Sequence, residues 1–175
     1  MTYTTSMTEV DLIQSCIAND RLAQKRLYEK YKKAMYSTCY RITGDFDLAQ
    51  DALQEGFIQV FRGLPKFRAE STLGAWIKTI IVRAAIKKIK KEPKFDPLEY
   101  ANEKDYVDWG HYLDAEYLEK AIMLLPDGYR IVFTMIEIEG YAHKDVAAKL
   151  GISEGTSKSQ LYHAKRKLRT MIDRY

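Results

Sequence analysis

Hydrophobic residues recur at helical spacing along most of the chain, and no segment shows the convincing alternation of a β-strand. The spacing predicts helices over residues 12–17, 22–40, 47–62, 72–91, 114–125, 129–138, 144–150 and 154–172. The breaks between the first four fall at turn residues, such as Gly44, Gly63 and Pro65. Either Ser71 or Thr72 can cap the fourth helix. The pattern therefore predicts an all-α fold.

A stretch without helical periodicity separates two groups of predicted helices. Between residues 93 and 111 the chain has two prolines, many acidic residues and scattered aromatic residues, which is typical of a linker. We therefore expect two small helical domains, residues 1–91 and 114–175, joined by an acidic linker over residues 92–113.

The charged residues divide the chain in a similar way. Residues 1–90 carry 15 basic and 9 acidic side chains, residues 91–120 carry 4 and 9, and residues 121–175 carry 9 and 6. Two basic blocks around an acidic one suggest two contacts with a polyanion, because charge asymmetry reflects partners rather than fold. Two solvated surfaces fit the same charges, so both interpretations stay open at this point.

The overall composition excludes several classes of protein. The chain has 175 residues, of which 46% are hydrophobic and 30% charged, so it is globular rather than disordered. No hydrophobic run approaches the roughly 18 residues that a membrane span requires, and no signal peptide is visible, so we expect no membrane insertion. Cys16 and Cys39 form no CxxC pair and are expected to be reduced core residues of a cytoplasmic protein.

Residues 141–168 have the spacing of a helix-turn-helix. Ala147 is small enough for a close helix crossing, Gly151 permits a sharp turn, and Ile152 fills the space between the helices. The outer face of the second helix offers hydroxyl and amide groups to base edges and basic groups to phosphates. These candidate DNA contacts are Thr156, Lys158, Ser159, Gln160, His163, Lys165 and Arg166. The alternative is an ordinary helical hairpin with a solvated face.

The third predicted helix has a polar face that includes an isoleucine. Asp51 and Glu55 lie one turn apart with Gln54 beside them, and Ile58 extends the same strip. An exposed isoleucine beside two like charges is a poor solvated face but a reasonable protein-docking face. The alternative is a surface helix with one stray apolar residue.

The fourth predicted helix is strongly basic, because residues 76–91 contain six lysine or arginine side chains and no acid. A polar strip runs between its two apolar stripes, and a polar loop over residues 66–72 precedes it. Basic groups beside aromatic ones suit single-stranded nucleic acid, because bases stack while Lys and Arg follow the phosphates. The candidate contacts are Arg68, Ser71, Thr72, Trp76, Thr79, Arg83, Lys87 and Lys90. For Trp76 we favour the alternative that it fills the core.

Taken in order, these segments resemble a bacterial extracytoplasmic-function (ECF) sigma factor, a small sigma-70-family subunit of RNA polymerase. The segment DLAQDALQEGFIQVF at 47–61 is similar to the region 2 segment that docks on core polymerase. The segment FRAESTLGAWIKTIIVRAAIKKIKK at 67–91 is similar to the part that melts and recognises the minus-ten promoter element. Residues 124–168 are similar to region 4, which binds the minus-thirty-five element.

The resemblance implies a role for each candidate surface. It assigns the strip on the third helix to core RNA polymerase, and the two basic helices to promoter DNA. It also implies an anti-sigma factor as a further partner, a stress or envelope-signal regulon, and no enzymatic activity. Many relatives carry Val at the position of Ser157 and Arg at those of Gln160 and His163, so the promoter sequence itself is not implied.

Two other classes of function are alternatives. A stand-alone helix-turn-helix regulator binds duplex DNA without polymerase, usually at a palindromic site. A helical nuclease needs clustered carboxylates to hold metal ions, whereas the acidic residues here lie along helix faces or in the linker. His163 has no partners at metal-ligand spacing, so we expect neither a metal site nor a cofactor.

Overall fold

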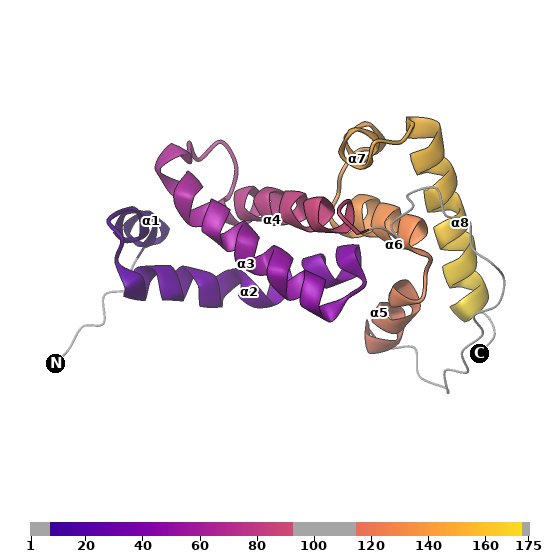
Figure 1. The fold of residues 1–175 in the computed structure, drawn as a ribbon, viewed down its shortest axis with the longest axis horizontal. Coiled ribbons are helices and arrows are strands. Elements are labelled where there is room, and N and C mark those ends of the chain that lie inside the picture. The colour runs from indigo at the N-terminus through magenta and orange to yellow at the C-terminus, as the bar shows by residue number, and fades with distance from the viewer. Residues whose placement is uncertain (1–7, 93–114, 173–175) are drawn as a thin grey trace.

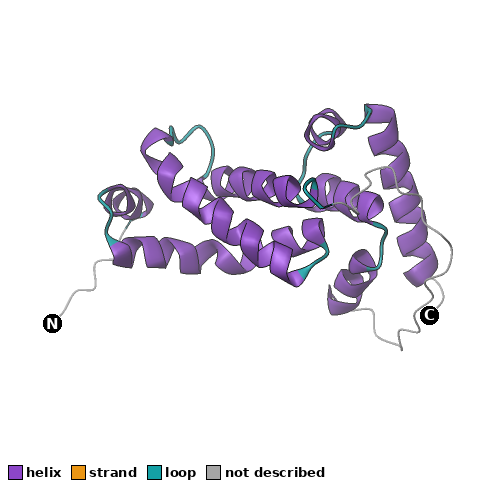
Figure 2. Cartoon of the chain, viewed as in Figure 1, coloured by secondary structure: helices purple, strands orange, loops and turns teal. Residues whose placement is uncertain are grey.

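The computed structural model describes residues 8–92 and 115–172, and within these ranges every regular element is a helix (Figures 1 and 2). The elements are α1 Glu9–Ile17, α2 Arg21–Thr43, α3 Phe46–Gly63, the 3-10 helix η1 Leu64–Lys66, α4 Leu73–Ile89, α5 Ala115–Met123, α6 Asp127–Phe133, the π-helix η2 Thr134–Ile138, α7 His143–Leu150 and α8 Glu154–Ile172. The all-α prediction is confirmed. The predicted linker lies almost entirely outside the described residues.

Side-chain caps and glycines set the bounds of several helices. Thr72, rather than Ser71, caps α4, because its hydroxyl accepts a hydrogen bond from the Ala75 N–H at 3.3 Å. Gly44 ends α2 and Gly151 ends α7, each with a positive φ that a side chain disfavours. These local signals explain why the helical periodicity predicts the elements closely.

Helices α1 to α4 form one end of the molecule and pack around a shared hydrophobic core (Figure 1). Gly56 lies where α3 meets α4, and a Cβ there would sit 2.5 Å from the Cδ1 atom of Ile81. Any side chain at this position would therefore force the end of the Ile81 side chain to move within the core. Cys16 and Cys39 are free and buried, as expected, and burial raises the pKa of the Cys39 thiol to about 12.

Helices α5 to α8 form the other end of the molecule (Figure 1). One core cluster joins α5, α6 and α8 through buried residues that include Ile122, Tyr129 and Leu168. Residues of α6 and η2, such as Ile131 and Met135, belong instead to the same continuous core as α2 to α4. The two groups of helices are therefore packed against one another in this structure.

Buried polar contacts accompany this packing. The Arg130 side chain on α6 is 5% exposed, and its Nε donates to the carbonyl oxygen of Arg41 on α2 at 2.9 Å. Its guanidinium also donates to the Leu125 carbonyl and pairs with Asp127. Gly44 makes room for this arrangement, because a Cβ there would lie 2.4 Å from the Arg130 Nη2 atom.

Candidate nucleic-acid interface

The predicted helix-turn-helix is present as α7, a turn at Gly151, and α8. Ala147 is buried on the inner side of α7, and Ile152 is half-buried between the helices. The Ser153 hydroxyl accepts from the Thr156 N–H at 2.9 Å and so caps α8. The local chemistry of the sequence therefore folds this segment as expected.

The outer face of α8 carries most of the predicted minus-thirty-five contacts. Lys158, Ser159, Lys165 and Arg166 are exposed. Thr156 and His163 are half-buried. The ring of His163 stacks on Tyr129 of α6 with centroids 5.8 Å apart, so this imidazole is held in place. Tyr162, which was not among the predicted contacts, is 63% exposed on α8.

Gln160 does not belong to this face, so that prediction is wrong. Its side chain is 3% exposed, whereas a base-contacting residue must be accessible. Position 160 lies one turn before the buried Ala164 and three residues after Ser157, which is fully buried, so it faces the inside of α8. The Ser157 hydroxyl lies 2.8 Å from Nδ1 of His143 on α7. The helical spacing contained this signal, but the polar type of Gln160 suggested an outer position.

The predicted minus-ten strip follows α4. Arg83, Lys87 and Lys90 are exposed, whereas Trp76 and Thr79 are half-buried. The Trp76 ring packs against Phe67 with centroids 5.1 Å apart.

Several basic groups of α4 are paired with carboxylates. Nζ of Lys87 lies 2.7 Å from Glu55 on α3, and Nζ of Lys88 lies 3.3 Å from Asp51. The hydrogen bond from Lys87 lowers the pKa of Glu55 below its usual 4.5. The positive charge of α4 is therefore partly neutralised by the helix beside it.

The loop before α4 is open to solvent. Arg68, Ser71 and Thr72 are all exposed. Ala69 has a φ of 54°, an uncommon value for a residue with a side chain. The loop therefore holds an unusual backbone conformation between two fixed helices.

The predicted docking strip is exposed along α3. Asp51 and Gln54 are exposed, Glu55 is half-buried, and Ile58 is 47% exposed. The two acids are not an uncompensated pair of like charges, because each forms an ion pair with a lysine of α4. The exposed isoleucine is thus the stronger reason to consider this strip a docking face.

Comparisons with known proteins match this organisation. The family model for Sigma-70 region 2 matches residues 27–94, and that for Sigma-70, region 4, matches residues 115–168. The ECF RNA polymerase sigma factor SigM of Mycobacterium tuberculosis is 25% identical over 171 residues, covering 94% of this chain and 85% of the relative. The RNA polymerase sigma-H factor of Pseudomonas aeruginosa is 26% identical, covering 92% of each chain. The chain belongs to the ECF sigma factors of the sigma-70 family.

A solved structure of a sigma factor also has this fold. The sigma factor RpoE of Bartonella quintana, in complex with the anti-sigma factor NepR, superposes with a TM-score of 0.51. The two chains are 20% identical, and the match covers 85% of this sigma factor and 96% of RpoE. In the chain described here, the region 2 match contains most of α2 and all of α3 and α4, and the region 4 match contains α5, α6, α7 and most of α8.

The described part of this sigma factor has neither a membrane-spanning helix nor a cluster of metal ligands. Within residues 8–92 and 115–172, no helix is both long and apolar enough to span a bilayer. Over the same residues, no group of three or more His, Cys, Asp or Glu side chains is arranged to hold a metal ion.

Proposed function

We propose that this RNA polymerase sigma factor recognises promoters through two separate helical surfaces. Helix α4 and the loop before it bind the opened minus-ten strand, and the outer face of α8 binds the minus-thirty-five element. The observation that carries the proposal is the outer face of α8, where exposed basic and hydroxyl groups lie on the second helix of a helix-turn-helix. Such a helix fits the major groove of DNA.

On α8 the contacts divide by chemistry. Thr156, Ser159 and His163 face base edges, where each good contact contributes about 1–3 kcal/mol of discrimination. Lys158, Lys165 and Arg166 bind phosphates and contribute affinity that is independent of sequence. Gln160 has no part in this division because its side chain is buried.

On α4 the contacts suit a single strand. The loop from Arg68 to Thr72 captures an unstacked base, and the strip that contains Arg83, Lys87 and Lys90 follows the backbone of the opened strand. The exposed cationic groups along α4 and the Phe67–Trp76 aromatic pair at its N-terminal end support this assignment.

The strip of Asp51, Gln54, Glu55 and Ile58 docks on core polymerase. We propose domain bounds of 1–91 and 114–175, with the acidic linker at 92–113 between them. Mounting both domains on one polymerase raises their joint affinity for a promoter through effective concentration. Each domain alone therefore binds DNA weakly.

We further propose an anti-sigma factor as a regulatory partner, because the structurally similar RpoE of Bartonella quintana was solved with one. The chain acts in the cytoplasm, where promoter DNA and polymerase are found. It controls a stress or envelope-signal regulon and catalyses no reaction of its own.

Run-off transcription with core polymerase on fragmented genomic DNA tests this function. The expected result is a limited set of transcripts whose start sites share two upstream motifs. Core polymerase without the chain is the matched control and is expected to give no such set. Identical transcripts with and without the chain would contradict the proposal.

A further inference from the structure

A short turn of region 4 lies against α4, at Lys78 and at the adjoining part of the strip that we assign to the opened strand. The turn comprises Glu139, Gly140 and Tyr141, between η2 and α7, and we call it the 139–141 turn. Gly140 has a φ of 77°, which allows the chain to reverse sharply there. The turn thus carries an acid and an aromatic residue to the surface of region 2.

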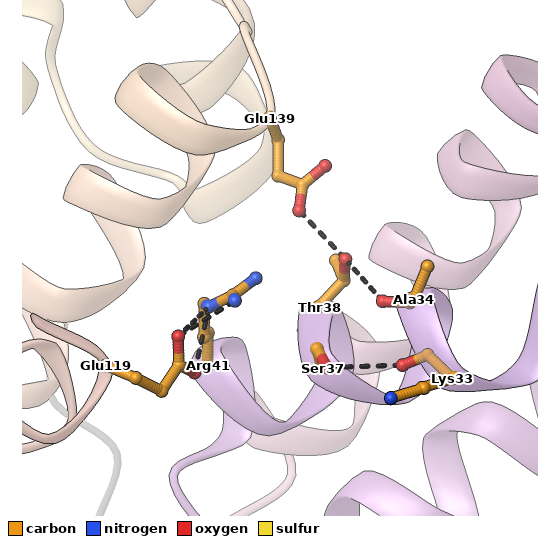
Figure 3. Close-up of polar contacts among 7 residues, drawn as sticks. All are labelled: Lys33, Ala34, Ser37, Thr38, Arg41, Glu119 and Glu139. Atoms are coloured by element: carbon orange, nitrogen blue, oxygen red, sulfur yellow. Dashed lines mark hydrogen bonds and ion pairs between the residues drawn. The ribbon is translucent and has the colours of Figure 1, made fainter. Parts of the chain in front are cut away.

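Glu139 makes the closest polar contacts. Its side chain is only 5% exposed, and its carboxylate lies 3.2 Å from Nζ of Lys78 on α4. The same carboxylate accepts a hydrogen bond from the Thr38 hydroxyl on α2 at 2.8 Å (Figure 3). A buried charge is tolerated only with such partners, so the pairing is specific to this packing of the two regions.

Tyr141 lies beside Lys78, next to Thr79 and Arg83 of the strip. Burial raises the pKa of its hydroxyl, while a hydrogen bond with Thr79 and the positive charges of Lys78 and Arg83 oppose that shift. Thr79 and Arg83 are both among the residues assigned to the minus-ten strand. The carboxylate of Glu139 therefore occupies a lysine that could bind a DNA phosphate. The ring of Tyr141 lies on residues that could contact a base.

A second set of contacts holds the two regions together away from α4. Arg41 on α2 donates from Nε and Nη2 to the Glu119 carboxylate on α5 at 2.8–3.0 Å (Figure 3). Arg130 on α6 donates to the backbone of α2 beside it. These bonds orient region 4 so that the 139–141 turn meets α4.

This packed arrangement is incompatible with binding both promoter elements. Elements at minus ten and minus thirty-five are about 25 base pairs apart, which is about 85 Å of duplex. Here a residue of region 4 is within ion-pair distance of α4. The two regions must separate before both elements are bound.

We propose that the 139–141 turn is an intramolecular competitor of the minus-ten strand, with Glu139 in the place of a phosphate and Tyr141 in that of a base. The free chain is therefore held in a closed form that has low affinity for single-stranded DNA. The proposal rests on the assignment of α4 to that strand. The new element is that α4 becomes accessible to the strand only when region 4 separates from region 2.

The test measures the affinity of the full chain for a fluorescent single-stranded DNA oligonucleotide by anisotropy. Glu139→Gln removes the ion pair with Lys78 but keeps the shape of the side chain, and Thr38→Val removes the hydroxyl donor from the region 2 side. Each is expected to raise the affinity about tenfold, within the usual range of coupling between sites. Glu116→Gln is the matched control, because it removes an exposed acid that pairs with Lys120 within α5.

A second readout follows the separation of the two regions directly. Energy transfer between dyes on cysteines introduced at Gln50 of α3 and Arg169 of α8, both exposed, is expected to fall in Glu139→Gln and not in Glu116→Gln. Unchanged affinity in both region-contact variants would overturn the proposal, whether or not energy transfer falls. Circular dichroism checks that each variant remains helical.

Adding Arg83→Ala separates failure of this inference from failure of the function proposed for α4. If Arg83→Ala lowers affinity but Glu139→Gln and Thr38→Val do not raise it, α4 binds the strand and only the competition is wrong. If Arg83→Ala has no effect even in the Glu139→Gln chain, α4 is not the strand-binding surface, and both proposals fail.

Discussion

Helices α4 and α8 are both basic, yet their charges have different surroundings. On α4, Lys78, Lys87 and Lys88 each form an ion pair with a carboxylate from another element. On α8, Lys165 pairs with Glu137, whereas Lys158 and Arg166 form no ion pair with any described residue. A count of basic residues along the sequence treats the two helices alike, but the fold neutralises one of them far more.

This difference in ion pairing affects how easily each surface binds a DNA phosphate. A phosphate that approaches α8 meets largely unpaired cations, so binding requires little rearrangement. A phosphate that approaches Lys78, Lys87 or Lys88 of α4 must displace Glu139, Glu55 or Asp51 from that lysine. We therefore expect α4 to be the regulated surface and α8 the permanently available one.

The largest expected effect comes from reversing the two acids on α3. Asp51→Lys with Glu55→Lys removes both carboxylates from the docking strip and is expected to weaken core binding by about 4 kcal/mol, since like charges across an interface cost several kcal/mol. The fold should persist, because ion pairs at the protein surface contribute at most about 1 kcal/mol each. Pull-down of core polymerase measures the loss.

The matched control for that variant reverses Glu9 and Glu29. Both are exposed acids that pair with lysines, Lys30 and Lys32, away from the docking strip. This control is expected to bind core polymerase normally. Equal loss in both double variants would show that net charge, rather than the strip on α3, governs the interaction.

Substitution of one glycine in each region compares how tightly the backbone is packed around Gly56 in region 2 and around Gly151 in region 4. Gly56→Val forces a side chain against Ile81 between α3 and α4 and should lower the free energy of unfolding by about 3 kcal/mol. Gly151→Ala meets no atom within 4 Å and adds only backbone strain at a φ of 77°, which costs about 1 kcal/mol. Urea unfolding measures both, and equal losses would contradict the tight packing of region 2.

Phosphate contacts on α8 should depend on whether the cation is already paired. Arg166→Ala and Lys165→Ala should each weaken binding to all promoter sequences alike and reduce the slope of log affinity against log salt by about 1. The loss should be smaller for Lys165, because Glu137 already competes for it at 2.7 Å. Promoter binding by holoenzyme at several salt concentrations measures this, and a larger loss for Lys165 would argue against competition by ion pairing.

The smallest effect concerns sequence preference. Ser159→Ala should change the preferred minus-thirty-five sequence, with a difference of about 1 kcal/mol at the affected base. Gln160→Leu should alter thermal stability and leave the preference unchanged, because Gln160 is buried. Binding to a promoter library by holoenzyme distinguishes the two, and a changed preference in Gln160→Leu would contradict the assigned faces of α8.

The sequence allowed most elements to be predicted, because their bounds depend on local chemistry. Thr72 caps its own helix and Gly151 ends another, so neighbouring residues contain the necessary information. The π-helical end of the 129–138 segment was not predicted, because helical periodicity does not distinguish such a turn. Gln160 was misplaced because its polarity was given more weight than its spacing from Ala164.

The contacts between the two regions could not be predicted from the sequence. Thr38 and Glu139 are 101 positions apart, and Arg41 and Glu119 are 78 apart. An acid in the sequence does not show which of many basic residues it meets, because that choice depends on the three-dimensional packing. The candidate site residues were therefore predicted one surface at a time, without the contact that joins them.

The most direct test of the account is a gel shift on duplex promoter DNA with and without core polymerase. The account predicts a stable, promoter-specific complex only when core polymerase is present, because the free chain does not engage both elements at once. A specific complex formed equally well by the chain alone would contradict it and favour a stand-alone regulator.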